Sequence, residues 1–235
     1  MKFIRYESRF EAGEILVDYI VKKNSSFKDF ILKNNNQFFC FAIPNGGVPV
    51  TEGFCSKLSI KYDILIVRKI KIPYNTEAGF GAVTTDGTIL INKSLLTQLN
   101  LSEKAVEHSI NLTKEEISER LKFYNRISIS EDFYRKNIEN KYIFILDDGL
   151  ASGFTMLAAL NMIKKYNPSK VYVAVPTAPL RTVRVVEKEV DDLFCPNIRD
   201  VLWFAVADAY KNWYDVPETE VLDMINNSNY YICNL

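Results

Sequence analysis

The sequence predicts an α/β fold: a mostly parallel sheet flanked by helices, with a β-hairpin and a C-terminal segment outside that pattern. Short apolar runs alternate with amphipathic segments along most of the chain, which is typical of a parallel sheet with helical crossovers. The strongest run, YIFILDDG at 142–149, passes through a turn of small residues into another helix-like segment. With 235 residues, the chain fits a single domain over 1–235 with a sizeable core.

The first half of the chain is predicted to contribute a helix, then a strand, a helix and a strand. Apolar side chains at helical spacing mark the opening helix: Phe10, Ile15, Leu16, Tyr19 and Ile20. The elements that follow are a buried strand at 38–44 closed by Pro44, a loop at 44–47, an amphipathic helix at 48–58 and a strand, DILIVRK, at 63–69. The polar stretches at 24–26 and 33–36 are predicted to be loops.

The second half is predicted to begin with a hairpin. Two β-rich runs over 80–93 flank Asp86-Gly87, a dipeptide that permits a type I′ turn. Ser102 precedes a long polar helix that extends to about 124. The remaining elements are the strand at 142–149, a helix from about 153 to 166, a strand at 171–176, a helix to about 189 and a final strand at 191–195.

The composition excludes several classes of function. One histidine, His108, and cysteines spread over positions 40, 55, 195 and 233 do not make a Cys/His metal site. Equal numbers of basic and acidic residues, 29 each, give no general attraction to nucleic acid. The chain lacks the ~18-residue apolar window of a membrane helix and the apolar core of a signal peptide. We therefore expect a cytoplasmic protein that binds neither nucleic acid nor membrane.

A pair of acids ends the strongest strand, and a turn of small residues follows it. Ligands of α/β folds bind at the carboxyl ends of the strands, so Asp147 and Asp148 can bind vicinal hydroxyls or the waters of a Mg²⁺ ion. The turn offers backbone N–H groups, the hydroxyls of Ser152 and Thr155, and a helix N-terminus, which suit one phosphate monoester. The simpler interpretation is a polar turn in which Ser152 is the N-cap of a helix.

Two hydrolase sites fit this stretch poorly. A nucleophile elbow has Gly two residues on each side of the serine, whereas Gly149 lies three residues before Ser152 and Gly153 directly follows it. A phosphate-ester hydrolase that attacks through Asp147 would need a supporting Lys and further acids at other strand ends. The turn is better suited to holding a phosphate than to attacking one.

Residues 143–155 resemble the phosphoribosyl pyrophosphate (PRPP) signature of type I phosphoribosyltransferases: an apolar strand, two acids, a few small or apolar residues, then Ser/Thr-Gly-x-Ser/Thr. Three further segments resemble this family in order and spacing: AIPNGGVPV at 42–50, IVRKIKIPYNTEAGFGAV at 66–83 and VAVPTAP at 173–179. The similarity covers nearly the whole chain and is greatest to a bacterial and archaeal group whose acceptor base is generally unassigned. It implies PRPP as substrate and Mg²⁺ as cofactor, with Asp147 and Asp148 on the ribose hydroxyls and the metal.

The resemblance also implies which segments bind the phosphates. The 5-phosphate would lie on the turn formed by Gly149, Leu150, Ala151, Ser152, Gly153, Phe154 and Thr155. The pyrophosphate would lie on Asn45, Gly46 and Gly47, because a side chain at 46 or 47 would hinder approach to the backbone N–H groups. A tight turn is the simpler interpretation of the glycines. The group usually has Arg where this chain has Asn45, so one positive charge is missing there.

Two cations follow the apolar part of the strand at 63–69. We expect Arg68 and Lys69 to end that strand near the crevice, where a leaving pyrophosphate needs positive charge. Because successive side chains of a strand point to opposite faces, at most one of them is expected to reach the ligand. A solvated strand end is the alternative. By resemblance, KIPYNTEAGF at 71–80 is a mobile loop that closes over the reacting centre.

The tail at 205–225 is aromatic, with Tyr210, Trp213 and Tyr214 close together before Pro217. These rings are candidates for stacking on a nucleobase, although packing of the tail against the core is favoured for each ring taken singly. By resemblance, a variable hood covers the base. The candidates for lid or hood are the segments at about 70–93 and 203–235.

The sequence therefore predicts a phosphoribosyltransferase that moves the phosphoribosyl group from PRPP to a nitrogenous base and releases pyrophosphate. By resemblance, hypoxanthine and guanine enzymes carry Asp where this chain has Ala151, whereas adenine enzymes carry Ala. A purine-like base is therefore favoured, but the base stays open. The alternative is a PRPP-binding regulator or sensor without turnover, which Asn45 slightly favours. Assembly into a homo-oligomer also stays open.

Overall fold

The computed structural model describes residues 3–126 and 130–232. Its core is a five-stranded parallel sheet in the order β2-β1-β6-β7-β9, as the alternation of apolar runs predicts. The strands are β1 (Phe38–Ala42), β2 (Tyr62–Ile64), β6 (Tyr142–Leu146), β7 (Lys170–Ala174) and β9 (Asp192–Phe194). Ala42 pairs with Leu146 at the ends of β1 and β6. The segments that follow these two strands therefore leave the sheet side by side.

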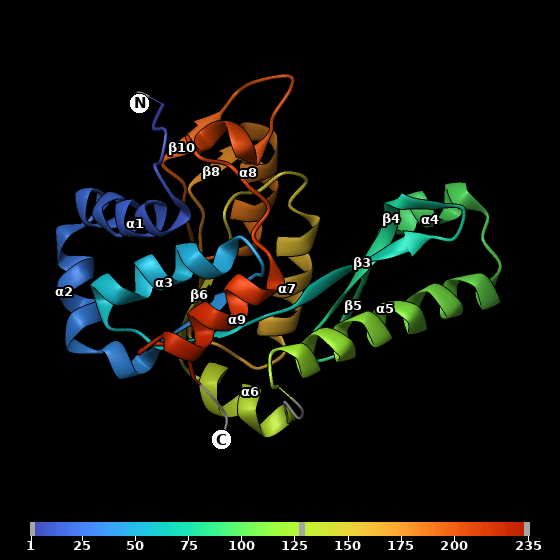
Figure 1. Ribbon diagram of the computed structural model, residues 1–235, viewed down its shortest axis with the longest axis horizontal. Helices are drawn as coiled ribbons and strands as arrows, with labels where there is room; N and C mark the ends of the chain where they lie inside the picture. Colours follow the sequence, from blue (N-terminus) through green and yellow to red (C-terminus); the bar gives the residue numbers. More distant parts are fainter. Residues whose placement is uncertain (1–2, 127–129, 233–235) are drawn as a thin grey trace.

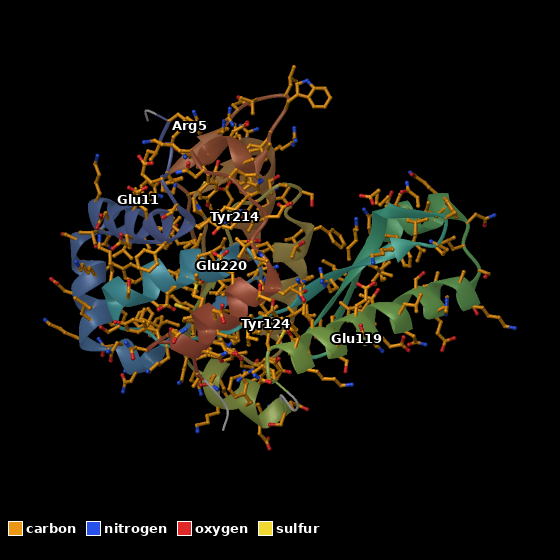
Figure 2. All side chains as sticks on the ribbon, viewed as in Figure 1. Arg5, Glu11, Glu119, Tyr124, Tyr214 and Glu220 are labelled. Carbon is orange, nitrogen blue, oxygen red and sulfur yellow. The ribbon has the colours of Figure 1, made fainter. Side chains whose placement is uncertain are left out.

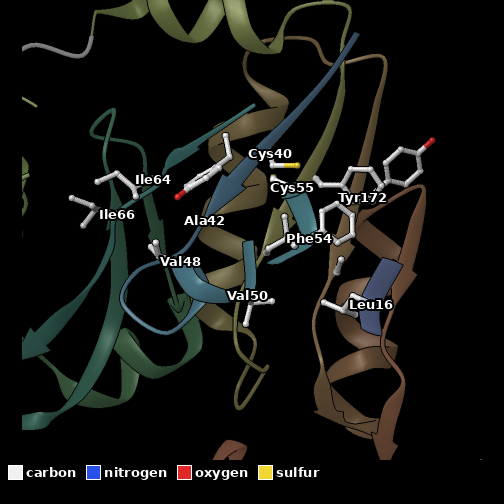
Figure 3. Packing of buried hydrophobic residues seen from close by; sticks show 14 of the residues in the cluster. Leu16, Cys40, Ala42, Val48, Val50, Phe54, Cys55, Ile64, Ile66 and Tyr172 are labelled. Atoms are coloured by element: carbon white, nitrogen blue, oxygen red, sulfur yellow. The ribbon is translucent and has the colours of Figure 1, made fainter. Parts of the chain in front are cut away.

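Helices cover both faces of the sheet (Figure 1). One face carries α1 (Arg9–Lys23), α2 (Ser25–Lys33) and α3 (Gly47–Leu58), and the other carries α6 (Glu131–Ile138) and α7 (Phe154–Lys164). The side chains of β1 alternate accordingly: Cys40 and Ala42 pack with α1 and α3, whereas Phe39 and Phe41 pack with α6 and α7. Figure 3 shows the first of these cores, where Cys40 lies near Cys55 of α3.

The polar residues at 24–26 begin a helix instead of forming the predicted loop. Asn24 is the N-cap of α2, and its Oδ1 accepts a hydrogen bond from the backbone N–H of Phe27 at 3.2 Å. Asn is favoured at this position because its side chain satisfies an otherwise unpaired helix N–H. The stretch at 33–36 ends α2 and leads into a 3-10 turn, η1 (Asn35–Gln37). The predicted opening helix is confirmed as α1, except that Phe10 lies on its solvent side and is 40% exposed.

The predicted strand at 63–69 is in fact parts of two strands in different sheets. β2 ends at Ile64, and β3 (Val67–Ile72) pairs with β4 (Asn75–Thr84), which pairs with β5 (Ile89–Ile91) in an antiparallel sheet. Leu65 and Ile66, between β2 and β3, are buried, so the apolar run continues across the break. Arg68 and Lys69 consequently lie near the start of β3 and do not end a core strand, which corrects the sequence prediction.

The antiparallel sheet belongs to an arm that projects from the core (Figure 1). The arm consists of β3, β4 and β5 with α4 (Lys93–Leu99) and α5 (Glu103–Phe123), and α5 packs along β3. Residues 71–80, predicted to be a mobile loop, form most of the β3–β4 hairpin. The second hairpin, predicted from Asp86-Gly87, is confirmed between β4 and β5, with Gly87 at φ +82°.

Asp86 anchors this second hairpin to the core. One carboxylate oxygen accepts hydrogen bonds from the Thr84 hydroxyl at 2.7 Å and the Thr88 N–H at 2.9 Å. The other oxygen accepts from Lys165 Nζ at 2.8 Å and from the Tyr166 hydroxyl at 2.9 Å. Because Lys165 and Tyr166 follow α7 directly, the base of the arm is fixed to the helix that follows the turn over 149–155.

The C-terminal third adds a small parallel pair, β8 (Thr177–Pro179) with β10 (Asn197–Arg199), beside α8 (Leu180–Val186). The chain then passes through a 3-10 turn, η3 (Val206–Ala209), to α9 (Glu218–Asn227), which packs on α3. Tyr210 forms a β-bridge with Tyr6, so the tail meets the segment that precedes α1.

Two expectations about the whole chain concern membranes and cysteines. Within 3–126 and 130–232, no helix is long and apolar enough to cross a membrane. Cys40, Cys55 and Cys195 are buried free thiols, and burial raises the pKa of the Cys55 thiol well above its usual range. Cys233 and the end of the predicted hood, 233–235, lie outside the described residues.

Candidate functional site

The acid pair directly follows β6, at the carboxyl edge of the sheet. Arg9 Nε lies 2.8 Å from Asp148 Oδ2, and the Tyr210 hydroxyl donates a hydrogen bond to the Asp148 carbonyl at 2.7 Å. Asp147 Oδ1 accepts from the Asp148 N–H at 2.8 Å. The Asp148 side chain keeps 15% of its exposure, so a ligand can reach it from solvent.

The two carboxylates share an environment that disfavours their negative charge. Burial raises the pKa of Asp147 well above its usual range, and the charge of Asp148 raises it further. Burial also raises the pKa of Asp148, against the opposing effect of Arg9. A divalent cation would stabilise both ionised forms. The described residues contain no group of three or more His, Cys, Asp and Glu side chains that could enclose an ion. Two carboxylates that share the ion with waters and substrate oxygens fit Mg²⁺.

The glycine pair at the start of α3 packs against the acids. A Cβ on Gly46 would lie 2.0 Å from Asp148 Oδ2, and a Cβ on Gly47 would lie 2.9 Å from the Leu146 carbonyl and 3.0 Å from Asp147 Cα. The pairing of β1 with β6 brings the two segments to the same edge of the sheet. The predicted pyrophosphate segment and the predicted acid pair are therefore in contact.

The turn over 149–155 connects the acid pair to α7 and is held from behind. Gly149 packs on Val206, the Leu150 N–H donates to the Thr177 carbonyl at 3.0 Å, and the Ala151 carbonyl accepts from the Thr182 hydroxyl at 2.7 Å. These contacts fix the backbone of the turn to β8 and α8.

The exposed side of this turn leads into the N-terminus of α7. Gly153, at φ +77°, is the N-cap, so Ser152 is not the N-cap that the simpler interpretation required. Ser152 Oγ accepts a hydrogen bond from the Phe154 N–H at 3.3 Å, and the hydroxyls of Ser152 and Thr155 are on exposed residues. A helix N-terminus with nearby hydroxyls suits an anion.

Asn45 brings a cation from the arm to the pyrophosphate segment. Its Oδ1 accepts a hydrogen bond from Arg120 Nη2 at 2.8 Å, and its Nδ2 donates to the Val216 carbonyl at 2.7 Å. Arg120 lies in the last turn of α5, and its side chain is 10% exposed. A guanidinium therefore lies beside position 45 although the residue there is uncharged.

Arg68 and Lys69 are not brought to the same place. Arg68 is partly buried and lines a cavity with Arg120. Burial lowers the pKa of Arg68, and the charge of Arg120 lowers it further. Lys69 is exposed, lies over Gly79, and donates a hydrogen bond to the Glu77 carbonyl. Arg68 therefore lies beside Arg120, whereas Lys69 does not.

The three aromatic residues of the tail surround Arg9. The guanidinium carbon of Arg9 lies 5.3 Å from the ring centroid of Tyr210, 4.2 Å from that of Trp213 and 5.5 Å from that of Tyr214. Tyr210 is buried and packs as core, whereas Trp213 is 40% and Tyr214 49% exposed. Figure 2 shows Tyr214 near Glu220 of α9, to which its hydroxyl donates a hydrogen bond at 2.6 Å. Base stacking by the two exposed rings stays a prediction.

Residues 17–212 match the family model of the phosphoribosyl transferase domain. The chain belongs to this phosphoribosyl transferase family. A Mycobacterium tuberculosis protein, provisionally named a phosphoribosyl transferase, is 28% identical over 187 residues, which are 80% of this chain and 41% of that protein. The matched part of the chain thus spans only 41% of the length of that relative. Uracil phosphoribosyltransferase of Ureaplasma parvum is 43% identical over 61 residues, which are 25% of this chain and 30% of that protein.

Among solved structures, the protein TT1426 from Thermus thermophilus has the same fold, with a TM-score of 0.71. The two chains are 22% identical, and the superposition covers 94% of this chain and 97% of that one. The fold, and with it the placement of the sheet edge that carries the site, is thus shared with a known structure.

Two arginines that no sequence motif indicates, Arg9 and Arg120, lie at the candidate site of this phosphoribosyl transferase domain. Arg9 is 139 residues from Asp148 in the sequence, and Arg120 is 75 residues from Asn45. No local motif connects partners so far apart. The one signal for Arg120 is its position three residues after Ile117, at the border of the apolar stripe of α5.

Proposed function

We propose that the protein binds PRPP with Mg²⁺ and transfers the phosphoribosyl group to a ring nitrogen of a nucleobase, with release of pyrophosphate. The observation that carries the proposal is the contact of Gly46 with Asp148 and of Gly47 with Asp147. A backbone segment suited to binding a polyphosphate lies there beside carboxylates suited to binding sugar hydroxyls. The bond that breaks in the reaction joins these two parts of PRPP. Membership of the phosphoribosyl transferase family supports the same reaction.

Each part of the site has a role in this reaction. Asp147 and Asp148 hold the ribose hydroxyls and the metal, the turn over 149–155 holds the 5-phosphate, and Asn45, Gly46 and Gly47 with Arg68 hold the pyrophosphate. When bound, Mg²⁺ neutralises part of the negative charge of the pyrophosphate. Lys69 has no direct role in this arrangement, because its ammonium binds the Glu77 carbonyl.

The residues favour the transition state by stabilising the charge that the reaction separates. The base nitrogen forms a bond to C1 of the ribose and releases its proton to solvent, while the C1–O bond to pyrophosphate breaks and pyrophosphate leaves with the electron pair. Positive charge develops on the sugar beside Asp147 and Asp148, and negative charge accumulates on the leaving group beside the backbone of Gly46 and the guanidinium of Arg68. Interactions that strengthen as charge develops lower the barrier.

The acceptor base is proposed to be purine-like, with uracil as the competing candidate. Ala151 stands where oxopurine enzymes carry Asp, which favours an adenine-like base. Uracil is the competing candidate because 25% of the chain is similar to the uracil phosphoribosyltransferase of Ureaplasma parvum. Trp213 and Tyr214 are partly exposed rings over Arg9, which pairs with Asp148, and they are the proposed stacking surface.

Calorimetric titration with PRPP in the presence of Mg²⁺ tests the first half of the proposal. We expect the wild type to bind and Asp148→Asn to bind at least about 10-fold more weakly, because a charged acceptor of the ribose and metal is lost. Asp29→Asn is the matched control, since Asp29 is exposed on α2. Thermal unfolding of each variant checks that it folds. A wild type that does not bind PRPP would overturn the proposal.

Pyrophosphate release in the presence of adenine, hypoxanthine, guanine or uracil tests the second half. Release that depends on one base identifies the transferase and its acceptor. The alternative is a PRPP sensor without turnover, which two observations favour: Asp148 is already paired with Arg9, and position 45 carries no charge of its own. Tight PRPP binding without base-dependent release would establish the sensor.

A further inference from the structure

Two arginines of the arm share a cavity in which part of each guanidinium has no partner. The cavity measures about 490 Å³ and lies between the arm and α9. It is lined by Arg68, Lys71, Glu116, Glu119, Arg120, Phe123 and Glu218. Nε of Arg68 and Nε of Arg120 are both buried and make no hydrogen bond to any residue in the described part of the chain. Two neighbouring guanidiniums with unpaired donors favour a ligand with several anionic oxygens.

The carboxylates of the same cavity leave Arg68 unpaired. Glu116 binds Lys71 Nζ at 2.6 Å, and Glu218 binds Arg120. Glu119 is exposed to solvent on α5, where Figure 2 labels it. Within residues 3–126 and 130–232, Arg68 has no ion pair with a carboxylate within 4 Å, and its positive charge is available to a ligand.

A hydrogen bond from Arg120 to Asn45 connects this cavity to the site. Arg120 Nη2 binds Asn45 Oδ1 at 2.8 Å, and the next residue, Gly46, packs against the Asp148 carboxylate. Arg120 therefore lies next to the segment proposed to bind pyrophosphate. An anion bound beside Gly46 is the nearest candidate for the acceptor that Nε of Arg120 and Nε of Arg68 lack.

We infer that Arg120 is the second cation of the pyrophosphate subsite, beside Arg68, and that Glu218 holds its guanidinium until the diphosphate of PRPP takes its place. This inference rests on the proposed function. Glu218 is 39% exposed, and ion pairs with an exposed partner are weak. A diphosphate is the stronger partner, because it presents several charged oxygens to the planar donor fork of arginine.

The exchange would couple ligand binding to the C-terminal segment. Glu218 lies in the first turn of α9, and the carbonyl of Val216, two residues earlier, binds Asn45 Nδ2 at 2.7 Å. When the ligand displaces Glu218, the start of α9 loses its ion pair to the arm. Glu218 is thus a carboxylate latch that competes with the substrate for Arg120.

Titrations of Arg120→Met with three probes test the role of Arg120. We expect Mg²⁺-pyrophosphate and PRPP to bind about 10–100-fold more weakly than to the wild type, and ribose 5-phosphate to bind equally well. The matched control is Lys122→Met, an exposed cation on the same helix, which should bind all three like the wild type. If Arg120→Met does not fold, Arg120→Lys, which keeps the charge and loses the fork, should show a smaller loss with the same probe pattern.

Glu218→Gln tests the latch. Removal of the competing carboxylate should tighten pyrophosphate binding about 2–5-fold, whereas Asp223→Asn, the same charge change at an exposed position of α9, should not. A wild type that binds neither PRPP nor pyrophosphate refutes the proposed function itself. A wild type that binds both, with equal affinities in Arg120→Met or weaker binding in Glu218→Gln, overturns this inference alone.

Discussion

Arg9 Nε lies 2.8 Å from Asp148 Oδ2, so the first helix and the end of β6 meet in an ion pair at the centre of the site. Arg9 is only 6% exposed, and the rings of Tyr210 and Trp213 cover its guanidinium. The start of α1 and the segment before α9 thereby cover the acid pair from opposite ends of the chain. We expect the stability of the fold and the binding of a ligand to depend on this same contact.

Replacement of Arg9 should destabilise the fold. Arg9→Met leaves the Asp148 carboxylate without its cation, and breaking a buried pair in this way costs about 3–5 kcal/mol, less if Asp148 takes up a proton. Urea denaturation at pH 7 measures the free energy of unfolding. Arg9→Lys should recover part of it. A stability equal to that of the wild type would show that the pair contributes nothing.

Gly46→Ala should impair binding more than stability. A Cβ at this position would lie 2.0 Å from Asp148 Oδ2 and 3.1 Å from Arg9 Nε, so the acid must move. We expect PRPP affinity to fall at least about 10-fold, with a loss of about 1–3 kcal/mol in stability. Gly87→Ala is the contrasting variant: its φ of +82° makes it strained, but it lies in the Asp86-Gly87 turn and should bind normally. Similar affinities in both variants would argue against the close approach.

Asp86→Asn should loosen the base of the arm in a pH-dependent manner. Burial raises the pKa of Asp86, but hydrogen bonds from Lys165, Thr88 and Thr84 outweigh it and lower the pKa to about 2. A lowered acid pKa adds stability above about pH 4 that is lost as the pH falls towards 2. Wild type should exceed Asp86→Asn by about 1–3 kcal/mol at pH 7, and the difference should shrink in acid. Denaturation curves at pH 7, 4, 3 and 2 measure it; a constant difference contradicts the assignment.

Asp63 should give the opposite pH dependence. Burial raises the pKa of Asp63 to about 7, although the buried Arg126 opposes this shift. The folded state then holds the proton more tightly than the unfolded chain, so the stabilising effect is greatest below about pH 4 and declines as the pH rises to 7. The stability of the wild type relative to Asp63→Asn should therefore fall across this window, by at most about 1.4 kcal/mol for each pH unit.

A matched titration separates this effect from the rest of the chain. Asp29 is exposed on α2, so the difference between the wild type and Asp29→Asn should stay nearly constant from pH 4 to 7. If the Asp63→Asn difference is equally flat, or grows with pH, Arg126 holds Asp63 ionised in the folded state and the predicted shift is wrong.

The core sheet could be predicted from the sequence because each of its strands is a separate apolar run. The break between β2 and β3 could not, because Leu65 and Ile66 stay apolar and buried while the chain changes sheets. Hydrogen bonds between Ile66 and Thr85 fix that exit, and they depend on a residue 19 positions away. The short helix α6, capped by Ser130, was also missed, since its eight residues give little periodicity.

The candidate site divides in the same way. The acid pair, the glycine pair and the turn over 149–155 are each a short run of consecutive residues. The residue types within each run are enough to indicate its chemistry. Arg9, Arg120 and Glu218 can be assigned to the candidate site only from the folded chain, in which β1 pairs with β6 and α5 packs along β3. The separation of Arg68 and Lys69 agrees with the alternation of side chains along a strand: Arg68 lines the cavity with Arg120, whereas Lys69 binds the Glu77 carbonyl.

The chain leaves the core sheet at Leu65 and Ile66. The residues of the candidate site consequently belong to two structural units. Carboxylates and amides sit on the sheet, whereas Arg68 and Arg120 sit on the projecting arm. Under the proposed function, we expect substitutions along the arm to change how strongly the leaving group is bound and to leave the binding of the sugar unchanged. In a protein of this design, selection can adjust turnover and substrate affinity through separate sets of residues.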